Sequence, residues 1–466
     1  MAGGRRKLKS ADVLEVLSSL VDKSLVSVEE TPQGQRYRFL ETVREYLIET
    51  HGHNAEAAKC RARHRECFIE FANRFGPRLE GAGAGAAMAL LEREHDNLRS
   101  AQESGLAESP TDSVRLAGLL RRFWLYGFWQ EGIERARRAL DAGVPCEDHD
   151  RARAFECLAG LCFQAGKLDD AEAAAMKGLR LSRSLEDREV LALCLNTLGN
   201  IYAERGKFAE ANLYFKECIE VGRQVENWRL VATATNNLGL IYFEQGEIDT
   251  AAEISEESLA VLKRAGLTAH SLLLVNLGCL HVELGNYERA EELLREAVQI
   301  GEEAGDKPAT FLAFTNLGLL CREKPDLLES RIALERALGI VEETGEFEGA
   351  YCARMGLSLV LYEMGELEQA ALRNRQGMSS VAALGHDSAT IEAMMIAGVI
   401  QSDPRLWGAA EKLRSKKGRA LSAYYRRLFD QYSAPLRAQM GDEAFEAAMR
   451  EGERMTTDEA IALVLG

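Results

Sequence analysis

The sequence predicts a mainly all-α protein, a solenoid of repeats of about 40 residues preceded by a short segment that mixes helices and strands. Three observations predict this class. Leu-Gly pairs recur at a nearly fixed interval, only 8 prolines occur among 466 residues, and 46% of the residues are hydrophobic. So few prolines leave little room for a turn-rich β architecture or for disordered linkers. Long helices therefore fit the composition best.

The first 50 residues alternate between helical and extended patterns. Residues 11–23 have helical periodicity, residues 24–28 and 36–40 alternate as two short strands around a turn, and Glu41 opens another helix. We therefore expect helix, hairpin and helix, which together look like the second half of a winged-helix domain, within residues 1–50.

The Leu-Gly pairs mark the repeats, and their intervals are 40, 39 and 40 residues. The pairs begin at Leu198, Leu238, Leu277 and Leu317. After the first leucine, Gly206 follows at the eighth position and Ala211 at the thirteenth. The glycine tolerates positive φ and so allows a tight reversal, while the alanine lets the second helix approach the first. The frame extends back to Leu158 and forward to Leu357, which predicts six helical hairpins within residues 151–385.

Weaker copies of the frame flank these six. Leu119 and Gly127 keep it within residues 51–150, which we expect to form a helical linker region with one degenerate repeat. Trp407 keeps part of it within residues 386–466, where terminal helices are expected to cover the last apolar face of the solenoid.

This frame resembles the tetratricopeptide repeat, and its long period is similar to that of the Leu-Gly-Asn repeat adaptors and the kinesin light chains. The strings Leu17-Ser-Ser-Leu-Val-Asp-Lys-Ser-Leu-Val and Arg36-Tyr-Arg-Phe-Leu-Glu-Thr-Val-Arg-Glu-Tyr resemble the winged helix of bacterial STAND-type regulators, which are NB-ARC-like signal-transduction ATPases with numerous domains. Stretches around Glu92, Arg121 and Gly452 are similar to the sensor half of the same family. The resemblance implies repeats that sense an inducer or partner, behind an effector domain and a nucleotide-binding domain.

The sequence departs from that plan because it has no G-x-x-x-x-G-K-[ST] loop and no Walker-type acidic strand. We therefore expect neither a nucleotide cofactor nor ATP hydrolysis. The resemblance also implies that the chain begins inside the winged helix. Either a separate NTPase or effector subunit supplies the remainder, or the chain is a truncated remnant of a larger regulator; whether Met1 is the natural start stays open.

Three short motifs could indicate a nucleotide, metal or catalytic site, and each has a simpler structural explanation. The glycine-rich stretch 81–87 lacks a preceding strand and is expected to be a flexible helix connector. His51 and His53 have no ligand cluster at metal spacing, and His95 has no recognisable nucleophile beside it. We therefore predict a non-enzymatic protein with no catalytic residues and no metal.

The net charge and the cysteines limit which partners and which cellular compartment we expect. With 57 basic and 73 acidic residues the net charge is −16, which argues against a broad nucleic-acid surface. A DNA-contacting winged-helix regulator using Arg36, Arg38 and Arg44 remains the alternative. Ten cysteines without a CxxC pair are interpreted as reduced core thiols, and from the sequence we expect neither a signal peptide nor a membrane-spanning helix. A cytoplasmic location without a membrane partner is expected.

The inner face of the solenoid is the expected binding surface for a protein or peptide. Asparagine amides there could pair with the backbone of an extended peptide, and a stripe of glutamates would favour a basic ligand, although both also occur for structural reasons alone. The asparagines are Asn196, Asn200, Asn236, Asn237, Asn276 and Asn316. The glutamates, here called the acidic stripe, are Glu204, Glu244, Glu283, Glu323 and Glu363. The sequence predicts a sensor or adaptor but names neither its partner, its pathway nor its oligomeric state.

Overall fold

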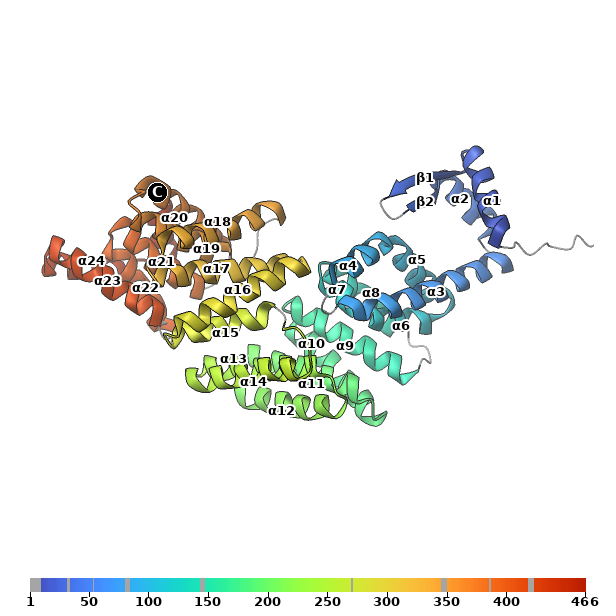
Figure 1. Cartoon of the computed structure of the whole chain (residues 1–466), viewed down its shortest axis with the longest axis horizontal. Coiled ribbons are helices and arrows are strands. Elements are labelled where there is room, and N and C mark those ends of the chain that lie inside the picture. Colours follow the sequence, from blue (N-terminus) through green and yellow to red (C-terminus); the bar gives the residue numbers. More distant parts are fainter. Residues whose placement is uncertain are drawn as a thin grey trace, which may run out of the picture.

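The computed structural model describes residues 10–31, 34–52, 54–79, 84–142, 147–269, 271–344, 350–384, 387–417 and 423–466. Within these residues the chain is almost entirely helical, and one two-stranded sheet lies near the N-terminus (Figure 1). Among the helices described, none combines the length and the apolar character that a membrane span requires. The predicted mainly α-helical solenoid is confirmed.

The N-terminal segment contains the expected helix, hairpin and helix. Strand β1 pairs antiparallel with β2, and Val26 lies opposite Phe39. The elements are α1 (Ser10–Asp22), β1 (Val26–Thr31), β2 (Gly34–Phe39) and α2 (Glu41–His51). The first strand therefore begins two residues later than the alternation suggested. This segment projects from the rest of the molecule, beyond the start of α3 (Figure 1).

A helical region connects this segment to the repeats. It comprises α3 (Ala55–Phe75), the short 3-10 helix η1 (Gly76–Leu79), α4 (Ala84–Arg93), α5 (His95–Glu108), α6 (Pro110–Leu119), α7 (Arg121–Leu125) and α8 (Trp129–Asp141). The buried rings of Phe123 and Trp124 form its centre. His95 packs its ring against Phe123 and Phe128, with centroids 5.0 and 4.4 Å apart, so it serves as a packed helix contact.

One expectation for this region is wrong in part. The glycine-rich stretch was predicted to be a connector, but its residues 84–87 belong to helix α4 because alanine favours the helix and no proline interrupts it. Residues 81–83 and His53 lie outside the described residues.

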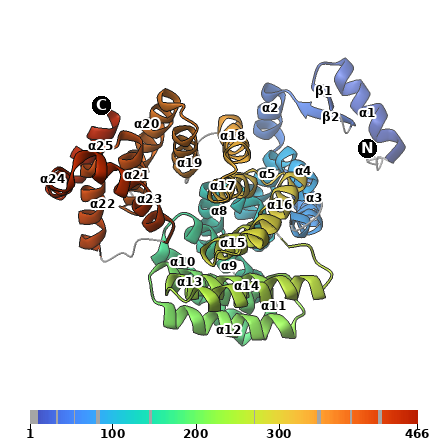
Figure 2. The ribbon, with the colours of Figure 1, turned by 60° about the vertical axis from the view of Figure 1, so that its left-hand side comes forward.

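Six helical hairpins follow and wind into a superhelix (Figure 2). They are α9 (Asp148–Gln164) with α10 (Leu168–Ser184), α11 (Arg188–Glu204) with α12 (Phe208–Gln224), α13 (Trp228–Glu244) with α14 (Ile248–Arg264), α15 (Ser271–Glu283) with α16 (Tyr287–Ala304), α17 (Lys307–Glu323) with α18 (Leu327–Thr344), and α19 (Ala350–Glu363) with α20 (Leu367–Leu384). The predicted turn glycines have positive φ, between 69° and 81°, at Gly166, Gly206, Gly246, Gly285 and Gly365. These turns therefore need glycine, as the frame suggested.

The glycine of the Leu-Gly pair has a second role that the frame did not reveal. A Cβ on Gly199 would lie 2.5 Å from Cε1 of Phe215, and one on Gly318 would lie 2.6 Å from Cγ of Leu334. In each case the large side chain comes from the second helix of the same hairpin. The missing side chain therefore lets the two helices of a hairpin approach closely, as does the fully buried Ala211.

Most cysteines lie in the core, as expected. The buried ones are Cys157, Cys162, Cys194, Cys218 and Cys321. Burial raises the pKa of Cys218 to about 12, so its thiol stays protonated. The prediction is wrong for Cys60 and Cys67, which are exposed on α3. Cys146 lies outside the described residues.

Five helices complete the chain: α21 (Asp387–Gln401), α22 (Pro404–Lys417), α23 (Ala423–Met440), α24 (Asp442–Gly452) and α25 (Thr457–Leu465). Trp407 is buried between α21 and its neighbours and donates its indole N–H to the Met395 carbonyl at 2.9 Å. Helices α22 and α24 cross closely, because a Cβ on Gly408 would lie 2.1 Å from the Met449 carbonyl oxygen. Helices α24 and α25 thus pack on the last hairpins as caps, whereas α23 takes a different course.

Candidate ligand-binding groove

The first helices of the hairpins line the inner side of the superhelix. Successive first helices contact one another directly, as α15 does with α17, α17 with α19 and α19 with α21. The face that these helices turn away from their partner helices is called the groove below. It carries most of the asparagines and glutamates that the sequence pointed to.

Three of the six asparagines gather where α11 meets α13. The Asn237 amide nitrogen donates to the side-chain oxygen of Asn200 at 2.9 Å and to that of Asn196 at 3.4 Å. All three side chains are half-buried. They form a cluster, called the amide cluster below, that holds donors and acceptors at the groove surface.

The other three asparagines do not extend this cluster. Asn236 is only 5% exposed, and its side-chain oxygen has no partner among the described residues. Placing it in the groove was wrong, because adjacent residues on a helix point about 100° apart and Asn237 already faces the groove. Asn316 donates to the Leu312 carbonyl of its own helix at 2.9 Å and accepts from the Cys279 thiol at 3.2 Å. The Asn276 side chain is half-buried and makes no hydrogen bond with a described residue.

The acidic stripe divides into two halves. Glu204 and Glu244 are exposed and form no ion pair with a described residue. Glu323 lies 3.1 Å from the Arg427 guanidinium and 3.3 Å from that of Arg322. Glu363 accepts three hydrogen bonds from Arg322, at 3.1, 3.2 and 2.7 Å. The acidic stripe was expected to attract a basic ligand. In its C-terminal half, arginines of the same chain pair with the glutamates instead.

Helix α23, which lies across the groove, supplies one of these basic groups, Arg427, while Arg322 belongs to α17 itself. Arg427 reaches Glu323 on α17, and the Tyr432 hydroxyl donates to Glu363 on α19. The Tyr425 hydroxyl donates to Glu392 on α21 at 3.3 Å. The C-terminal half of the groove is therefore covered by the protein's own helix, while none of these contacts of α23 involves a described residue of the half between α9 and α14.

Arg322 is the buried centre of these contacts. Its side chain is 4% exposed, and besides Glu363 and Glu323 it donates to the Tyr424 hydroxyl at 3.3 Å. Its guanidinium also lies 5.9 Å from the centre of the Tyr424 ring. Three helices thus meet at one guanidinium, whose planar set of five donors suits several acceptors at once.

Beneath α23 a cavity of about 240 Å³ remains between α15, α17, α19 and α21. Its walls combine apolar side chains, such as Leu319, Met355 and Ile396, with tyrosines and glutamates. The glutamates are Glu283, Glu323 and Glu392, and the tyrosines are Tyr351, Tyr424 and Tyr425.

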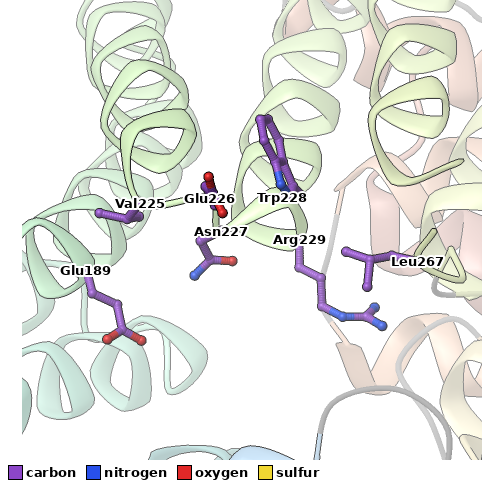
Figure 3. Close-up of a pocket in the computed structure, with 7 residues that line it drawn as sticks. All are labelled: Glu189, Val225, Glu226, Asn227, Trp228, Arg229 and Leu267. Atoms are coloured by element: carbon purple, nitrogen blue, oxygen red, sulfur yellow. The ribbon is translucent and has the colours of Figure 1, made fainter. Parts of the chain in front are cut away.

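A larger and more open depression of about 620 Å³ lies at the turns between hairpins (Figure 3). Glu189 comes from the start of α11, Trp228 and Arg229 come from the start of α13, and Leu267 follows α14 (Figure 3). Asn227 caps α13 by accepting from the Leu230 N–H at 3.2 Å. These residues form turns and caps at the edge of the superhelix rather than a converging set of ligand groups.

The arginines of the N-terminal segment face carboxylates. Arg36 lies 3.5 Å from Glu94, Arg38 4.0 Å from Glu29, and Arg44 3.7 Å from Glu41. This pairing does not favour the DNA-contacting alternative. The segment instead exposes large apolar side chains on both helices and the sheet, which are Val13, Leu14, Val16, Leu25, Val28, Phe39, Leu40, Tyr46, Leu47 and Ile48.

Sequence reasoning missed the residues that cover the groove. Arg322 sits in a frame position that holds Ala203, Phe243, Val282 and Tyr362 in other repeats, so the periodicity gave no reason to single it out. The string Tyr424-Tyr425-Arg426-Arg427 carried a signal, because it is aromatic and basic in an acidic chain that bears an acidic stripe. Charge complementarity between the two segments would have paired them.

Comparison with protein families agrees with this architecture. The model described as MalT-like TPR region matches residues 237–459, and two tetratricopeptide-repeat models match residues 150–224 and 196–264. The chain is therefore a tetratricopeptide-repeat protein with an α-solenoid fold.

Among curated relatives, proteins of Mycobacterium tuberculosis and Mycobacterium bovis named as HTH-type transcriptional regulators are 30% identical over 201 residues. The match covers 40% of this chain and 22% of each relative. The aligned part is thus about a fifth of the length of the curated relatives.

Two solved structures are similar to this chain at low sequence identity. A Rap protein complexed with competence and sporulation factor has a TM-score of 0.53 and 14% identity, covering 76% of this chain and 99% of that one. A STAND protein with a tetratricopeptide-repeat sensor from Pyrococcus horikoshii has a TM-score of 0.46 and 16% identity, covering 75% of this chain and 55% of that one. The winged-helix origin of the N-terminal segment stays a prediction.

Proposed function

We propose that this protein is a cytoplasmic, non-enzymatic regulatory sensor that binds a protein or peptide partner in the uncovered half of its groove. One observation carries the proposal. The amide cluster of Asn196, Asn200 and Asn237 lies on the inner helices in the half that α23 leaves open, and two exposed carboxylates of the acidic stripe, Glu204 and Glu244, lie on the same helices.

The chemistry of this surface suits an extended peptide. Amide side chains present both donors and acceptors, so they can pair with the N–H and C=O groups of a peptide backbone. Their mutual hydrogen bonds hold them in place before a ligand arrives, which lowers the entropy that binding must cost. The two free glutamates favour a partner with basic side chains. The Rap protein, whose fold is similar, is complexed with competence and sporulation factor, which supports ligand binding by this architecture.

The N-terminal segment is the proposed output of the sensor. Its exposed apolar side chains, including Leu14 at 65% and Tyr46 at 62% exposure, are of the kind that protein interfaces cover. We assign to this face a separate NTPase or effector subunit of a STAND-type signalling or transcription system. Partner binding in the groove would then change how this segment docks.

The test compares three forms of the protein by affinity capture from lysate of the source cells. The variant Asn196→Ala/Asn200→Ala/Asn237→Ala removes the amide cluster. The matched control, Lys216→Ala, changes an exposed residue on the outer helix α12. A partner held by the wild type and the control but lost by the triple variant, with unchanged circular dichroism, supports the groove. A partner held equally by all three would refute this assignment.

A further inference from the structure

The cavity beneath α23 has a wall chemistry that differs from the rest of the groove. Its volume of about 240 Å³ is below the range of about 300–1,000 Å³ that is typical for drug-sized ligands, so it suits a molecule of metabolite size. Four inner helices and α23 all contribute to its lining. It is lined by three tyrosine rings and by carboxylates on opposite elements, while aliphatic side chains fill the remaining wall.

Glu392 on α21 is held in place at one side of this cavity. The hydroxyls of Tyr351 and Tyr425 both donate to the same carboxylate oxygen of Glu392, each at 3.3 Å. The rings of Tyr424 and Tyr425 lie perpendicular to each other, with centroids 4.9 Å apart. The result is an oriented carboxylate beside aromatic rings, an arrangement that attracts cations both by charge and through the ring faces.

Glu283 on α15 has no such support. Its side chain is half-buried and lines the cavity, yet it makes no hydrogen bond or ion pair with a described residue. Burial raises the pKa of Glu283, and the Glu323 charge raises it further, while Arg427 opposes both. Arg427 is itself paired with Glu323 at 3.1 Å. The Arg427 charge is thus shared with Glu323 and only partly compensates the half-buried Glu283, which leaves room for a further cation at this carboxylate.

We propose that this cavity binds a small organic cation, an ammonium or guanidinium group on a short apolar chain, with Glu283 and Glu392 as counter-charges and Tyr351, Tyr424 and Tyr425 around it. The inference goes beyond the partner binding proposed above and can fail independently of it. The same chemistry occurs in free amines and in the side chain of a lysine or arginine within a peptide. The cover by α23 and the small volume favour the free amine.

Binding at this place would join distant parts of the chain. The cation would sit between α15 and α21, which belong to different repeats, and against the tyrosines of α23. It would therefore hold α23 on the groove more firmly. The ligand and the docking of α23 are thermodynamically linked, so a ligand that binds only the docked form must stabilise that form.

The experiment is isothermal titration of the purified full chain with agmatine and 1,5-diaminopentane as probes. A neutral probe of similar length, 1-pentanol, and the tripeptide Gly-Arg-Gly form separate arms. The variant Glu283→Gln removes the charge at constant shape. The control Glu244→Gln removes a stripe charge outside the cavity, on α13.

We expect saturable binding of a diamine or guanidinium probe and none of the neutral probe. Glu283→Gln should weaken binding about tenfold or more, whereas Glu244→Gln should change it by less than about twofold. Equal binding by the wild type and Glu283→Gln, or no saturable heat with any cation up to about 10 mM, would overturn the proposal. Binding of the tripeptide alone would overturn the assignment to a free amine.

Two further variants test the cation site independently of Glu283→Gln. Should Glu283→Gln fail to fold by circular dichroism, Tyr351→Phe removes one hydroxyl from Glu392 and is expected to weaken binding without unfolding the chain. Asn237→Ala, which is changed in the open half of the groove, should bind the cation like the wild type. Loss of cation binding in that variant would contradict the assignment to the cavity beneath α23.

Discussion

Replacing Glu363 by alanine should destabilise the C-terminal half of the solenoid strongly. The variant leaves the Arg322 guanidinium, whose side chain is 4% exposed, without the acceptor that it contacts at 2.7 and 3.1 Å. Removing one partner of a buried pair typically costs about 3–5 kcal/mol, because the remaining charge stays buried. Arg322 keeps Glu323 at 3.3 Å, so we expect a value near the lower limit, about 3 kcal/mol.

The assay is urea unfolding followed by circular dichroism, with the slope of the transition checked for a change in cooperativity. The matched control is Glu343→Ala, which removes the exposed partner of Lys307 and should leave the stability nearly unchanged, because water and salt screen an exposed pair. The double variant Arg322→Met/Glu363→Ala should regain part of the lost stability, since no charge is then left alone. A cost for Glu363→Ala as small as that of the control would refute the reasoning.

Two further predictions concern stability elsewhere in the chain. Burial alone would raise the pKa of Glu131, but hydrogen bonds from Arg99 and Arg135 lower it from 4.5 to about 2. This group should therefore contribute up to about 3 kcal/mol above pH 4.5 that is lost as the pH falls toward 2, and Glu131→Gln should flatten that part of a urea-midpoint profile. Gly408→Ala should lower the thermal midpoint, because the overpacking costs about 1–3 kcal/mol, whereas Gly339→Ala, with open space around its Cβ, should leave it unchanged or raise it.

The repeats could be predicted because their signals are local. A glycine with positive φ at the turn and a small residue at the close approach of two helices are requirements that each hairpin imposes on its own sequence. Gly206 and Ala211 meet them within a few positions of one another, and the structure places both as expected. Periodicity could therefore locate the turn and the close approach of the two helices within a hairpin.

The cover over the groove could not be predicted in the same way. Arg427 and Glu323 are 104 residues apart, and a repeat frame relates a residue only to its neighbours in the stack. Likewise, the frame treated Asn236 and Asn237 alike, although the helix turns by about 100° between them. The identity of the partner of a charged residue depends on long-range contacts that a repeating pattern does not contain.

The position of α23 also has a mechanical consequence. In a solenoid each hairpin contacts mainly its neighbours in the stack. Small changes at successive contacts can therefore add up, and the pitch of the superhelix can change at little energetic cost. Helix α23 acts as a brace across the inner side, because it is tied to α17, α19 and α21 at once. We therefore expect the hairpins that α23 contacts to keep a fixed pitch, and the hairpins from α9 to α14 to deform more easily. If the two ends of the superhelix were pulled apart, the extension would therefore occur mainly in the hairpins from α9 to α14, which also carry the amide cluster.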